Sequence, residues 1–317
     1  MSSKSNDQGR AYEYITLITL HAEISKVREA NIVENSSLEA AKNAWENMSK
    51  SMQNLLSVSA YSFVPEIFDL EPNILESDND VVELYIQKDK NGEDGDVRDI
   101  LIVRSGIEWE IGLSMKHNHF AVKHSRLSPL IDFGEKWYGH NCSDSYWEKT
   151  MPIFNRLNEL RISRTLWNKV PDKQQNIYVP VLKAFIDEVK MASTKHKDVP
   201  RKMTEYLLGQ YDFYKVISID REKTTRLNAF NLYGTLNHAS KENNPKRLIP
   251  RTILPTRIVS LDFKPKSKTT IELYMDNGWQ FSLRIHSADK VVQNSLKFDI
   301  QSIGMPTTII TINCRWK

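Results

Sequence analysis

The spacing of apolar residues near the start of the chain predicts an amphipathic helix over residues 9–33. Glu13 lies at the head of its apolar stripe instead of on the polar side. The stripe continues from it at helical steps with Leu17, Leu20 and Ile24. A buried carboxylate is costly unless it is paired or bound to a metal. Glu13 is therefore expected to be a metal ligand, to pair with Arg10 or Lys26, or to lie at a frayed helix end.

A second helix is predicted over 37–56, with Ser37 as its cap. After this helix, the apolar pattern changes from the helical period to the alternation that is typical of strands. Strands are predicted at 81–87, 98–104 and 108–116. Ser105 and Gly106 form a turn signal between the last two, so these two strands are expected to form a hairpin.

Three polar residues of this hairpin are expected to meet at one end of a small sheet. The turn places Asp99 opposite a residue within 112–114, and Ser114 and Lys116 share one face because side chains alternate along a strand. This arrangement suits a metal-dependent phosphodiesterase: the carboxylate holds a hard divalent cation, which activates water, and the lysine neutralises developing charge. The alternative is an ordinary strand in which an Asp lies beside a solvated Lys.

The second half of the chain divides into a helical and a strand-rich part. Helices are predicted at 147–166, 179–191 and 200–208. Strands are predicted at 214–219, 229–232, 258–263, 270–275, 279–285, 296–300 and 308–314, with a hairpin turn at Asp276-Asn277-Gly278. The change predicts a core with a helical insertion over 1–210 and a β-rich part over 211–317. One continuous domain is the alternative.

The composition is that of a globular protein with a sizeable core. Of the 317 residues, 40% are hydrophobic and 26% are charged. The sequence contains no apolar run long enough to span a membrane, and its polar N-terminus lacks the apolar region of a signal peptide. Cys142 and Cys314 are far apart in the sequence, which favours a reducing compartment. The expected location is therefore cytoplasmic.

The net charge of +3 does not by itself identify a nucleic-acid partner. A DNA-binding protein of this charge needs its positive residues focused into one cleft. Stretches that can do this are 116–126, 241–257 and 264–268. Within the first, His119, Lys123 and Arg126 follow the candidate lysine and suit phosphate contacts, although a polar loop is the alternative.

Several blocks of the sequence together resemble the type II restriction endonucleases of the PD-(D/E)xK superfamily, and more narrowly the HaeIII type. The blocks that carry the likeness are 9–14, 95–100, 112–119, 121–128, 279–286 and 295–299. The resemblance implies an α/β (α+β) fold in which a mixed central sheet is flanked by helices. It also implies Mg2+-dependent hydrolysis of both strands of duplex DNA, at GGCC for the HaeIII type, leaving 5′-phosphates.

By this resemblance, Asp99 ligates the metal and Lys116 positions or activates the attacking water. Glu13 looks like a helix glutamate that some members add to the metal site. The chain departs from the usual pattern twice, with Arg98 in place of proline and Ser114 in place of Asp or Glu. Because a serine hydroxyl is a weak metal ligand, Glu13 is expected to supply the missing carboxylate. The alternatives to Glu13 are Glu135 and Asp132, and the alternative to Asp99 is Asp96.

Reading G·C pairs requires Arg or Lys donors to guanine in the major groove. Arg284 and His286 lie two residues apart on one predicted strand face beside a hairpin, and Arg247 lies in a stretch punctuated by prolines. These are candidate DNA contacts, and a solvated strand arginine is the alternative for Arg284. A palindromic target implies either a homodimer or sequential nicking by a monomer.

Two other functions remain open from the sequence. The first is a catalytically inert, sequence-specific DNA-binding protein, which Ser114 favours. The second is an unrelated metal-dependent hydrolase of small phosphoesters. A methyltransferase is disfavoured because the sequence has no glycine-rich loop between a strand and a helix to hold a nucleotide cofactor.

Overall fold

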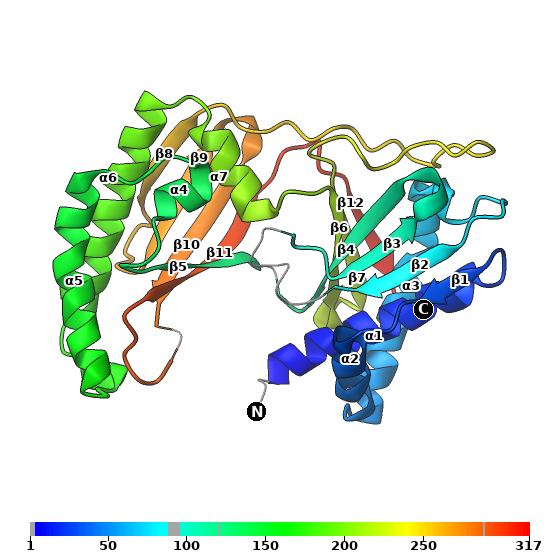
Figure 1. Ribbon diagram of the computed structural model, residues 1–317, viewed down its shortest axis with the longest axis horizontal. Helices are drawn as coiled ribbons and strands as arrows, with labels where there is room; N and C mark the ends of the chain where they lie inside the picture. The colour runs from blue at the N-terminus through cyan, green and yellow to red at the C-terminus, as the bar shows by residue number, and fades with distance from the viewer. Residues whose placement is uncertain (1–3, 88–95, 120, 288) are drawn as a thin grey trace. The chain divides into compact units, whose positions relative to one another are not determined.

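The computed structural model describes residues 4–87, 96–119, 121–287 and 289–317, and the chain forms two compact units (Figure 1). Unit 1 combines Met1–Phe120, Gly209–Thr252 and Thr307–Lys317, and unit 2 combines Ala121–Leu208 and Ile253–Pro306. Each unit contains helices and a sheet, in agreement with the predicted mixed α/β class. The chain passes between the units several times, so they are divided differently from the predicted parts 1–210 and 211–317.

Unit 1 is built on a seven-stranded mixed sheet with the order β1-β2-β3-β4-β6-β7-β12. Its strands are β1 (Ala30–Ile32), β2 (Val82–Ile86), β3 (Ile100–Arg104), β4 (Trp109–His117), β6 (Phe213–Ile219), β7 (Thr224–Phe230) and β12 (Thr311–Arg315). Strand β3 pairs antiparallel with both β2 and β4, whereas β4 pairs in parallel with β6. The predicted hairpin is confirmed. At its turn, a Cβ on Gly106 would lie 2.7 Å from Oδ1 of Asp80, which explains the glycine.

Three helices pack on one face of this sheet: α1 (Lys4–Ile24), α2 (Ser36–Glu46) and α3 (Lys50–Leu70) (Figure 1). The apolar residues of the predicted stripe, Leu17, Leu20 and Ile24, are fully buried in their shared core, and Leu113 and Met115 of β4 belong to the same core. Because successive side chains of a strand point to opposite faces, Ser114 and Lys116 face away from the helices. The polar side of β4 therefore lies on the face of the sheet opposite to these helices.

Two predicted helix boundaries were wrong. The helix predicted over 9–33 ends at Ile24, because residues 30–32 pair with β2 as a short edge strand. The helix predicted over 37–56 is divided into α2 and α3. The cap of α2 is Asn35, not Ser37, since the Asn35 side chain accepts two backbone hydrogen bonds of 2.9 Å. Ser49 caps α3 in the same way and starts a new helix.

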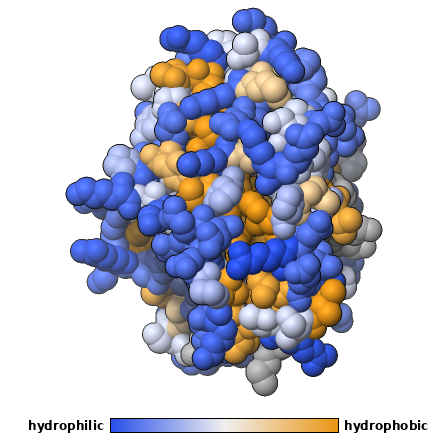
Figure 2. Space-filling model, turned by 90° about the vertical axis from the view of Figure 1, so that its left-hand side faces the viewer, coloured by the Kyte–Doolittle hydropathy of each residue, from blue (hydrophilic) through white to orange (hydrophobic). Residues whose placement is uncertain are grey.

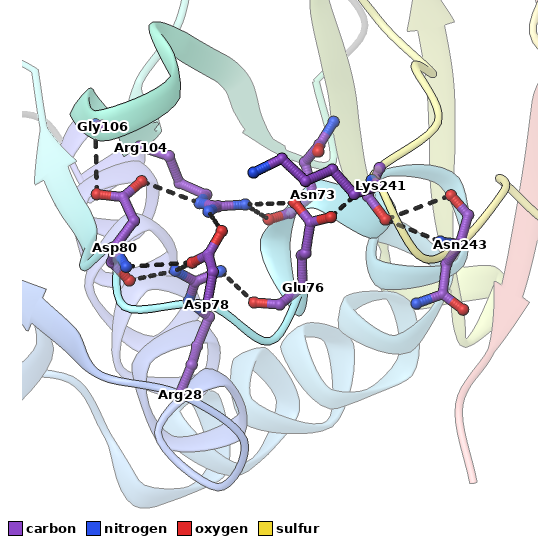
Figure 3. A network of polar contacts seen from close by, with 10 residues as sticks. Arg28, Asn73, Glu76, Asp78, Asp80, Arg104, Gly106, Lys241 and Asn243 are labelled. Carbon is purple, nitrogen blue, oxygen red and sulfur yellow. Dashed lines mark hydrogen bonds and ion pairs between the residues drawn. The ribbon is translucent and has the colours of Figure 1, made fainter.

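A buried charge network joins the loop before β2 to the end of β3 (Figure 3). Arg104 is fully buried, and its guanidinium pairs with Asp78, with Glu76 at 3.3 Å and with Asp80 at 3.2 Å. Arg28 also donates to Asp78, at 2.6 Å. The arginines hold the pKa of Asp78 below its ordinary value although burial opposes this. Buried charges need such partners, so the network fixes the loop against the sheet.

Unit 2 contains a five-stranded antiparallel sheet with helices on one face (Figure 1). In spatial order, its strands are β5 (Ala121–Leu127), β11 (Leu296–Gly304), β10 (Gln280–His286), β9 (Thr270–Met275) and β8 (Ile258–Phe263). The helices are α4 (Phe133–Tyr138), α5 (Asp144–Ile162), α6 (Val179–Lys195) and α7 (Val199–Leu208). An aromatic cluster joins them to the sheet, with ring centroids of Phe185 and Phe298 5.3 Å apart. Strand β5 was not predicted from the sequence, in which its residues were candidate phosphate contacts or, alternatively, a polar loop.

The side of unit 2 that carries α5 and α6 presents mostly hydrophilic residues, with hydrophobic ones between them (Figure 2). None of the helices within the described ranges has the length and apolar character needed to cross a membrane. Cys142 and Cys314 are free thiols, and both are buried.

Candidate active site

The backbone of Asp99 is held between two neighbouring strands just before β3. Its carbonyl oxygen accepts from the Gln87 amide at 2.9 Å, and its amide donates to the Leu113 carbonyl at 2.7 Å. These bonds extend the sheet by one residue on both sides. The predicted pairing of Asp99 with the region 112–114 is thus observed, and the side chain is placed beside the polar face of β4.

The carboxylate of Asp99 receives three donors from β4 on one oxygen. Oδ2 accepts from the Met115 amide at 2.6 Å, from Lys116 Nζ at 3.0 Å and from Ser114 Oγ at 3.4 Å. The Asp99 and Lys116 side chains are 27% and 28% exposed, so the pair is reachable from solvent. No donor from the described part of the chain reaches Oδ1, which leaves one carboxylate oxygen available to a cation.

Arg98, which stands where the resembled family has proline, is clamped beside this site. Its guanidinium donates to Asp96 at 2.8 Å and 2.9 Å and to Glu110 at 2.7 Å, and it lies 4.0 Å from the centre of the Tyr211 ring. Burial alone would raise the pKa of Asp96, but the bonds from Arg98 lower it below its ordinary value. Asp96 therefore serves this clamp, which argues against the alternative that it replaces Asp99.

The Arg98 clamp requires the glycine at position 112. A Cβ on Gly112 would lie 2.1 Å from Cδ of Arg98 and 2.5 Å from its Cγ. The stem of Arg98 thus crosses β4 directly over Gly112, two residues before Ser114 on the same face. Since Arg98 directly precedes Asp99, the clamp fixes the backbone that presents the Asp99 carboxylate.

Glu13 lies on α1 and is half-buried. It lines a cavity of about 270 Å³ together with Arg10, Gln87 and residues of α2. Gln87 is the residue whose amide binds the Asp99 carbonyl, so this cavity adjoins the strand end that carries Asp99. The donors to the Asp99 carboxylate are Ser114, Met115 and Lys116, and Glu13 is not among them.

The two alternative carboxylates lie in unit 2. Asp132 caps α4, where its oxygens accept from the amides of Glu135 and Cys142, each at 3.1 Å. Glu135 is exposed in the first turn of the same helix. Asp132 therefore has a structural role of its own. Across the described residues, no group of three or more His, Cys, Asp or Glu side chains is arranged to hold a metal ion.

The chemistry of the Asp99 site nevertheless fits Mg2+. This ion prefers hard oxygen ligands and usually takes only one or two carboxylates, while water and substrate phosphate supply the other ligands. The Asp99 carboxylate and the Ser114 hydroxyl are such oxygens. Together with Lys116, the site can hold a cation and a phosphate group side by side.

Lys215, the neighbour of Ser114 on β6, was not among the residues predicted for the site. In the parallel pair of β4 and β6, Ser114 lies beside Lys215, and Lys116 lies beside Ile217. The signal in the sequence was a single charged residue within a strand that is otherwise largely apolar. Predicting its location required knowing that β6 pairs with β4.

The candidate DNA-contacting residues are distributed over both units. His119 is exposed, and Arg247 of unit 1 pairs with Glu66 at 2.6 Å. Strand β5 includes position 123, but the Lys123 side chain lies outside the described part of the structure. Arg126 of β5 is exposed and donates to Ser295 Oγ at 3.1 Å.

Arg284 and His286 share the face of β10 that is turned away from the core of unit 2. Leu283 and Ile285, which alternate with them along the strand, are buried on the opposite face. Arg284 is 59% exposed, pairs with Asp299 at 3.4 Å and lines a cleft of about 520 Å³ with Lys264 and Lys266, among others. The ring of His286 is half-buried and bonds the Ser287 carbonyl at 2.8 Å. The structure thus places Arg284 in a basic cleft.

Comparison with known proteins gives one family. Residues 9–306 match the family model described as HaeIII restriction endonuclease. The chain is 48% identical, over 318 aligned positions, to the Type II restriction enzyme HaeIII of Haemophilus aegyptius, and the match covers 100% of both chains. No solved structure matches the chain.

Proposed function

The chain belongs to the HaeIII restriction endonuclease family and is a type II restriction enzyme, and we propose that it cuts duplex DNA at GGCC with Mg2+ bound at Asp99. The observation that carries the proposed site is the convergence of Ser114, Met115 and Lys116 on one oxygen of Asp99. The GGCC target rests on the family resemblance.

The order of elements supports a PD-(D/E)xK core in unit 1. A helix precedes three consecutive antiparallel strands, β2, β3 and β4, and the last of these pairs in parallel with β6. Asp99 is at the start of the second of these strands, and Lys116 is near the end of the third. The order of helix and three strands is the one that the resemblance implied for the core.

We assign a role to each residue of the site. Asp99 holds the cation, whose charge polarises the scissile phosphate and activates water when it is bound. Lys116 lies beside the same carboxylate, where it either positions the attacking water or stabilises the developing negative charge. Ser114 orients Asp99 and offers a weak oxygen ligand. Cleavage leaves a 5′-phosphate by this proposal.

Glu13 is proposed to supply the second carboxylate that Ser114 lacks. Its support is its half-buried position on α1 in a cavity that includes Gln87, whose amide binds the Asp99 carbonyl. Asp132 is less favoured because its carboxylate caps α4, and Glu135 remains an alternative.

The exposed face of the five-stranded sheet in unit 2 is the proposed DNA-contacting surface. Arg284 and the cleft it shares with Lys264 and Lys266 are suited to contact phosphates or guanine edges. Arg126 and Lys123 of β5, with His119 and His286, are proposed to add phosphate contacts, and Arg247 is proposed to contact DNA from unit 1. A palindromic target favours a homodimer, and a cytoplasmic location suits an enzyme that acts on intracellular DNA.

The direct test is incubation of the protein with a plasmid that carries GGCC sites, with Mg2+ or with EDTA. Discrete fragments that require Mg2+, and that disappear when every GGCC is mutated, support the proposal. Retardation of the plasmid in a gel without cutting would instead indicate an inert DNA-binding protein. Absence of both cutting and retardation, together with hydrolysis of a small phosphoester, would indicate an unrelated metal-dependent hydrolase.

A further inference from the structure

The end of β4 that carries Lys116 projects beyond the neighbouring strand β3. Ile100, the first residue of β3, pairs with Leu113, and the residues of β4 after Leu113 pair with β6 alone among the described strands. A strand that is held on one side at its end opens more readily than one that is held on both sides. Lys116 therefore needs a further support at the end of β4 to stay beside Asp99.

Three side chains join this end of β4 to the turn between β6 and β7. Nε2 of His117 lies 2.9 Å and 3.0 Å from the two carboxylate oxygens of Asp220. Nδ2 of Asn118 donates to Asp220 at 2.8 Å, and Oδ1 of Asn118 accepts from the Asp220 amide at 3.0 Å. The Asn118 amide also donates to the Ser218 carbonyl at 2.8 Å. We call His117, Asn118 and Asp220 the β4-end cluster.

The β4-end cluster fixes the backbone on which it is built. The His117 side chain is 5% exposed, and because a carboxylate only accepts, the imidazole donates from Nε2 to Asp220. Hydrogen bonds to an ionised acceptor are stronger than neutral ones. Asn118 has a φ of 52°, in the left-handed region, which asparagine tolerates because its short polar side chain bonds locally. The chain therefore turns at a fixed point two residues after Lys116.

The geometry argues against a direct contact of His117 with substrate. Side chains alternate along β4, so His117 projects to the face opposite to Ser114 and Lys116. Met115, on the same face as His117, belongs to the core beneath α1, α2 and α3. His117 is almost fully buried, and its Nε2 is bonded to Asp220. The imidazole can thus act on the reaction only through the backbone of β4.

We propose that the β4-end cluster positions Lys116 for catalysis by holding the projecting end of β4 against the turn between β6 and β7. The inference rests on the proposed function of the Asp99 site. Nζ of Lys116 lies 3.0 Å from Oδ2 of Asp99, a contact that depends on where the β4 backbone lies. Displacing a catalytic group by about 1 Å can lower a rate by roughly 100-fold. His117, Asn118 and Asp220 are therefore positioning residues, and none of them touches the reacting phosphate.

The test compares His117→Leu and His117→Gln with the wild type on a labelled duplex that contains one GGCC. Saturating enzyme and Mg2+ give the single-turnover cleavage rate, and the same duplex in EDTA gives the Kd. His117→Leu removes the bond to Asp220, and we expect the rate to fall by roughly 10- to 100-fold while the Kd changes little. The amide of glutamine can donate in place of Nε2, so His117→Gln should restore most of the rate.

Asn118→Gly tests the same inference at a second residue. Glycine adopts the φ of Asn118 without strain and removes only the side-chain bonds to Asp220, so the rate should fall in the same way. The matched control is Glu222→Ala, in the same turn as Asp220. The Glu222 carboxylate is 56% exposed and pairs with Arg226 at 3.7 Å, outside the β4-end cluster, so this variant should cut at the rate of the wild type. Tm is measured for every variant.

The outcomes separate this inference from the proposed function. If the wild type does not cut, both fail. If the wild type cuts, and His117→Leu and Asn118→Gly cut at a similar rate, only the positioning role is overturned. That role is also overturned if His117→Gln is as slow as His117→Leu, because the imidazole itself would then act in the reaction. Loss of folding in both His117→Leu and Asn118→Gly, or a rate loss matched by a rise in Kd, would overturn it in favour of a structural role. Slow cleavage by both folded variants with a normal Kd, restored by His117→Gln, supports the inference.

Discussion

Nζ of Lys116 lies 3.0 Å from Oδ2 of Asp99, although the two residues are 17 positions apart in the sequence. The β3–β4 hairpin brings them together. The same oxygen receives the Met115 amide, so the carboxylate is oriented before any ligand binds. Such preorganisation is what a metal-dependent nuclease needs at the position where charge develops.

Asp99→Ala and Lys116→Ala are each expected to lower the single-turnover rate of DNA cleavage by roughly 1,000-fold, because each removes a group that acts on the reacting phosphate. Binding to a GGCC duplex in EDTA should persist. The control is Asp187→Ala. The Asp187 carboxylate is 62% exposed and pairs with Lys149, and both residues are far from the site in the sequence. Near-normal cleavage by either site variant would move the active site elsewhere.

Glu13→Gln is expected to reduce cleavage severely, by roughly 100-fold, because the amide cannot supply the second negative charge to the cation. The loss should be partly relieved at high Mg2+ concentration, which a titration of rate against Mg2+ would measure. Glu39→Gln, at an exposed position of the neighbouring helix α2, is the control. If Glu13→Gln shows full activity, the second carboxylate is to be sought at Glu135 or Asp132.

Gly112→Ala is expected to disrupt the Arg98 clamp, because the new Cβ would lie 2.1 Å from Cδ of Arg98. Displacing that side chain should lower the free energy of unfolding by roughly 1–3 kcal/mol. It should also lower the cleavage rate, since Arg98 precedes Asp99. Denaturant titration and the plasmid assay measure the two effects.

The control for this substitution is Gly9→Ala. Nothing lies within 4 Å of a Cβ at Gly9, which is inside α1. Alanine there should leave stability unchanged or raise it by up to about 1 kcal/mol. Equal stability of Gly112→Ala and the wild type would show that the Arg98 side chain moves aside without lowering the free energy of unfolding.

The hairpin and its polar face could be predicted from the sequence because they depend on local features. Alternation of residues and the Ser105-Gly106 turn determine which side chains of β3 and β4 meet. The position of Lys215 could not be predicted, because it depends on the parallel pairing of β4 with β6, two strands separated by the helices of unit 2. The contact of Arg98 with the Tyr211 ring could not be predicted for the same reason, because Tyr211 also comes from beyond those helices.

The division of the chain into units was beyond prediction for a similar reason. Strand β12 at the end of the chain pairs with β7 of unit 1, whereas β8 to β11, which precede it, form the sheet of unit 2. Local composition changes near residue 210, but it carries no information about which distant strands pair. Strand β5 was missed because its alternation is masked by charged residues that pair with β11.

Arg104→Met is expected to destabilise unit 1 by about 3–5 kcal/mol, because it leaves Glu76, Asp78 and Asp80 near one another without their shared cation. Denaturant titration with a global fit measures the free energy of unfolding. Lys149→Met, which breaks the exposed pair with Asp187, should change it by less than about 1 kcal/mol. A small effect of Arg104→Met would show that the carboxylates in Figure 3 are adequately solvated without it.

Glu71→Gln is expected to raise stability above neutral pH. The Glu71 side chain is fully buried, and its Oε1 accepts from the Tyr214 hydroxyl at 2.5 Å and the Asn237 amide at 2.7 Å. Within the described residues, Oε2 has no hydrogen-bond partner. Burial raises the pKa of Glu71 from 4.5 to about 7, although both hydrogen bonds oppose the shift.

The sign of the pH dependence follows from this shift. Because the folded state favours the protonated acid, the wild type loses stability as pH rises from about 4.5 through about 7. Glutamine keeps the Oε1 acceptor and cannot ionise, so Glu71→Gln should be more stable by roughly 1–3 kcal/mol at pH 8. Unburied acids should not behave this way, and Glu242→Gln, at an exposed position, is the control. A wild type whose unfolding free energy does not fall relative to Glu71→Gln between pH 5 and pH 8 would show that Glu71 is ionised in the folded protein without cost.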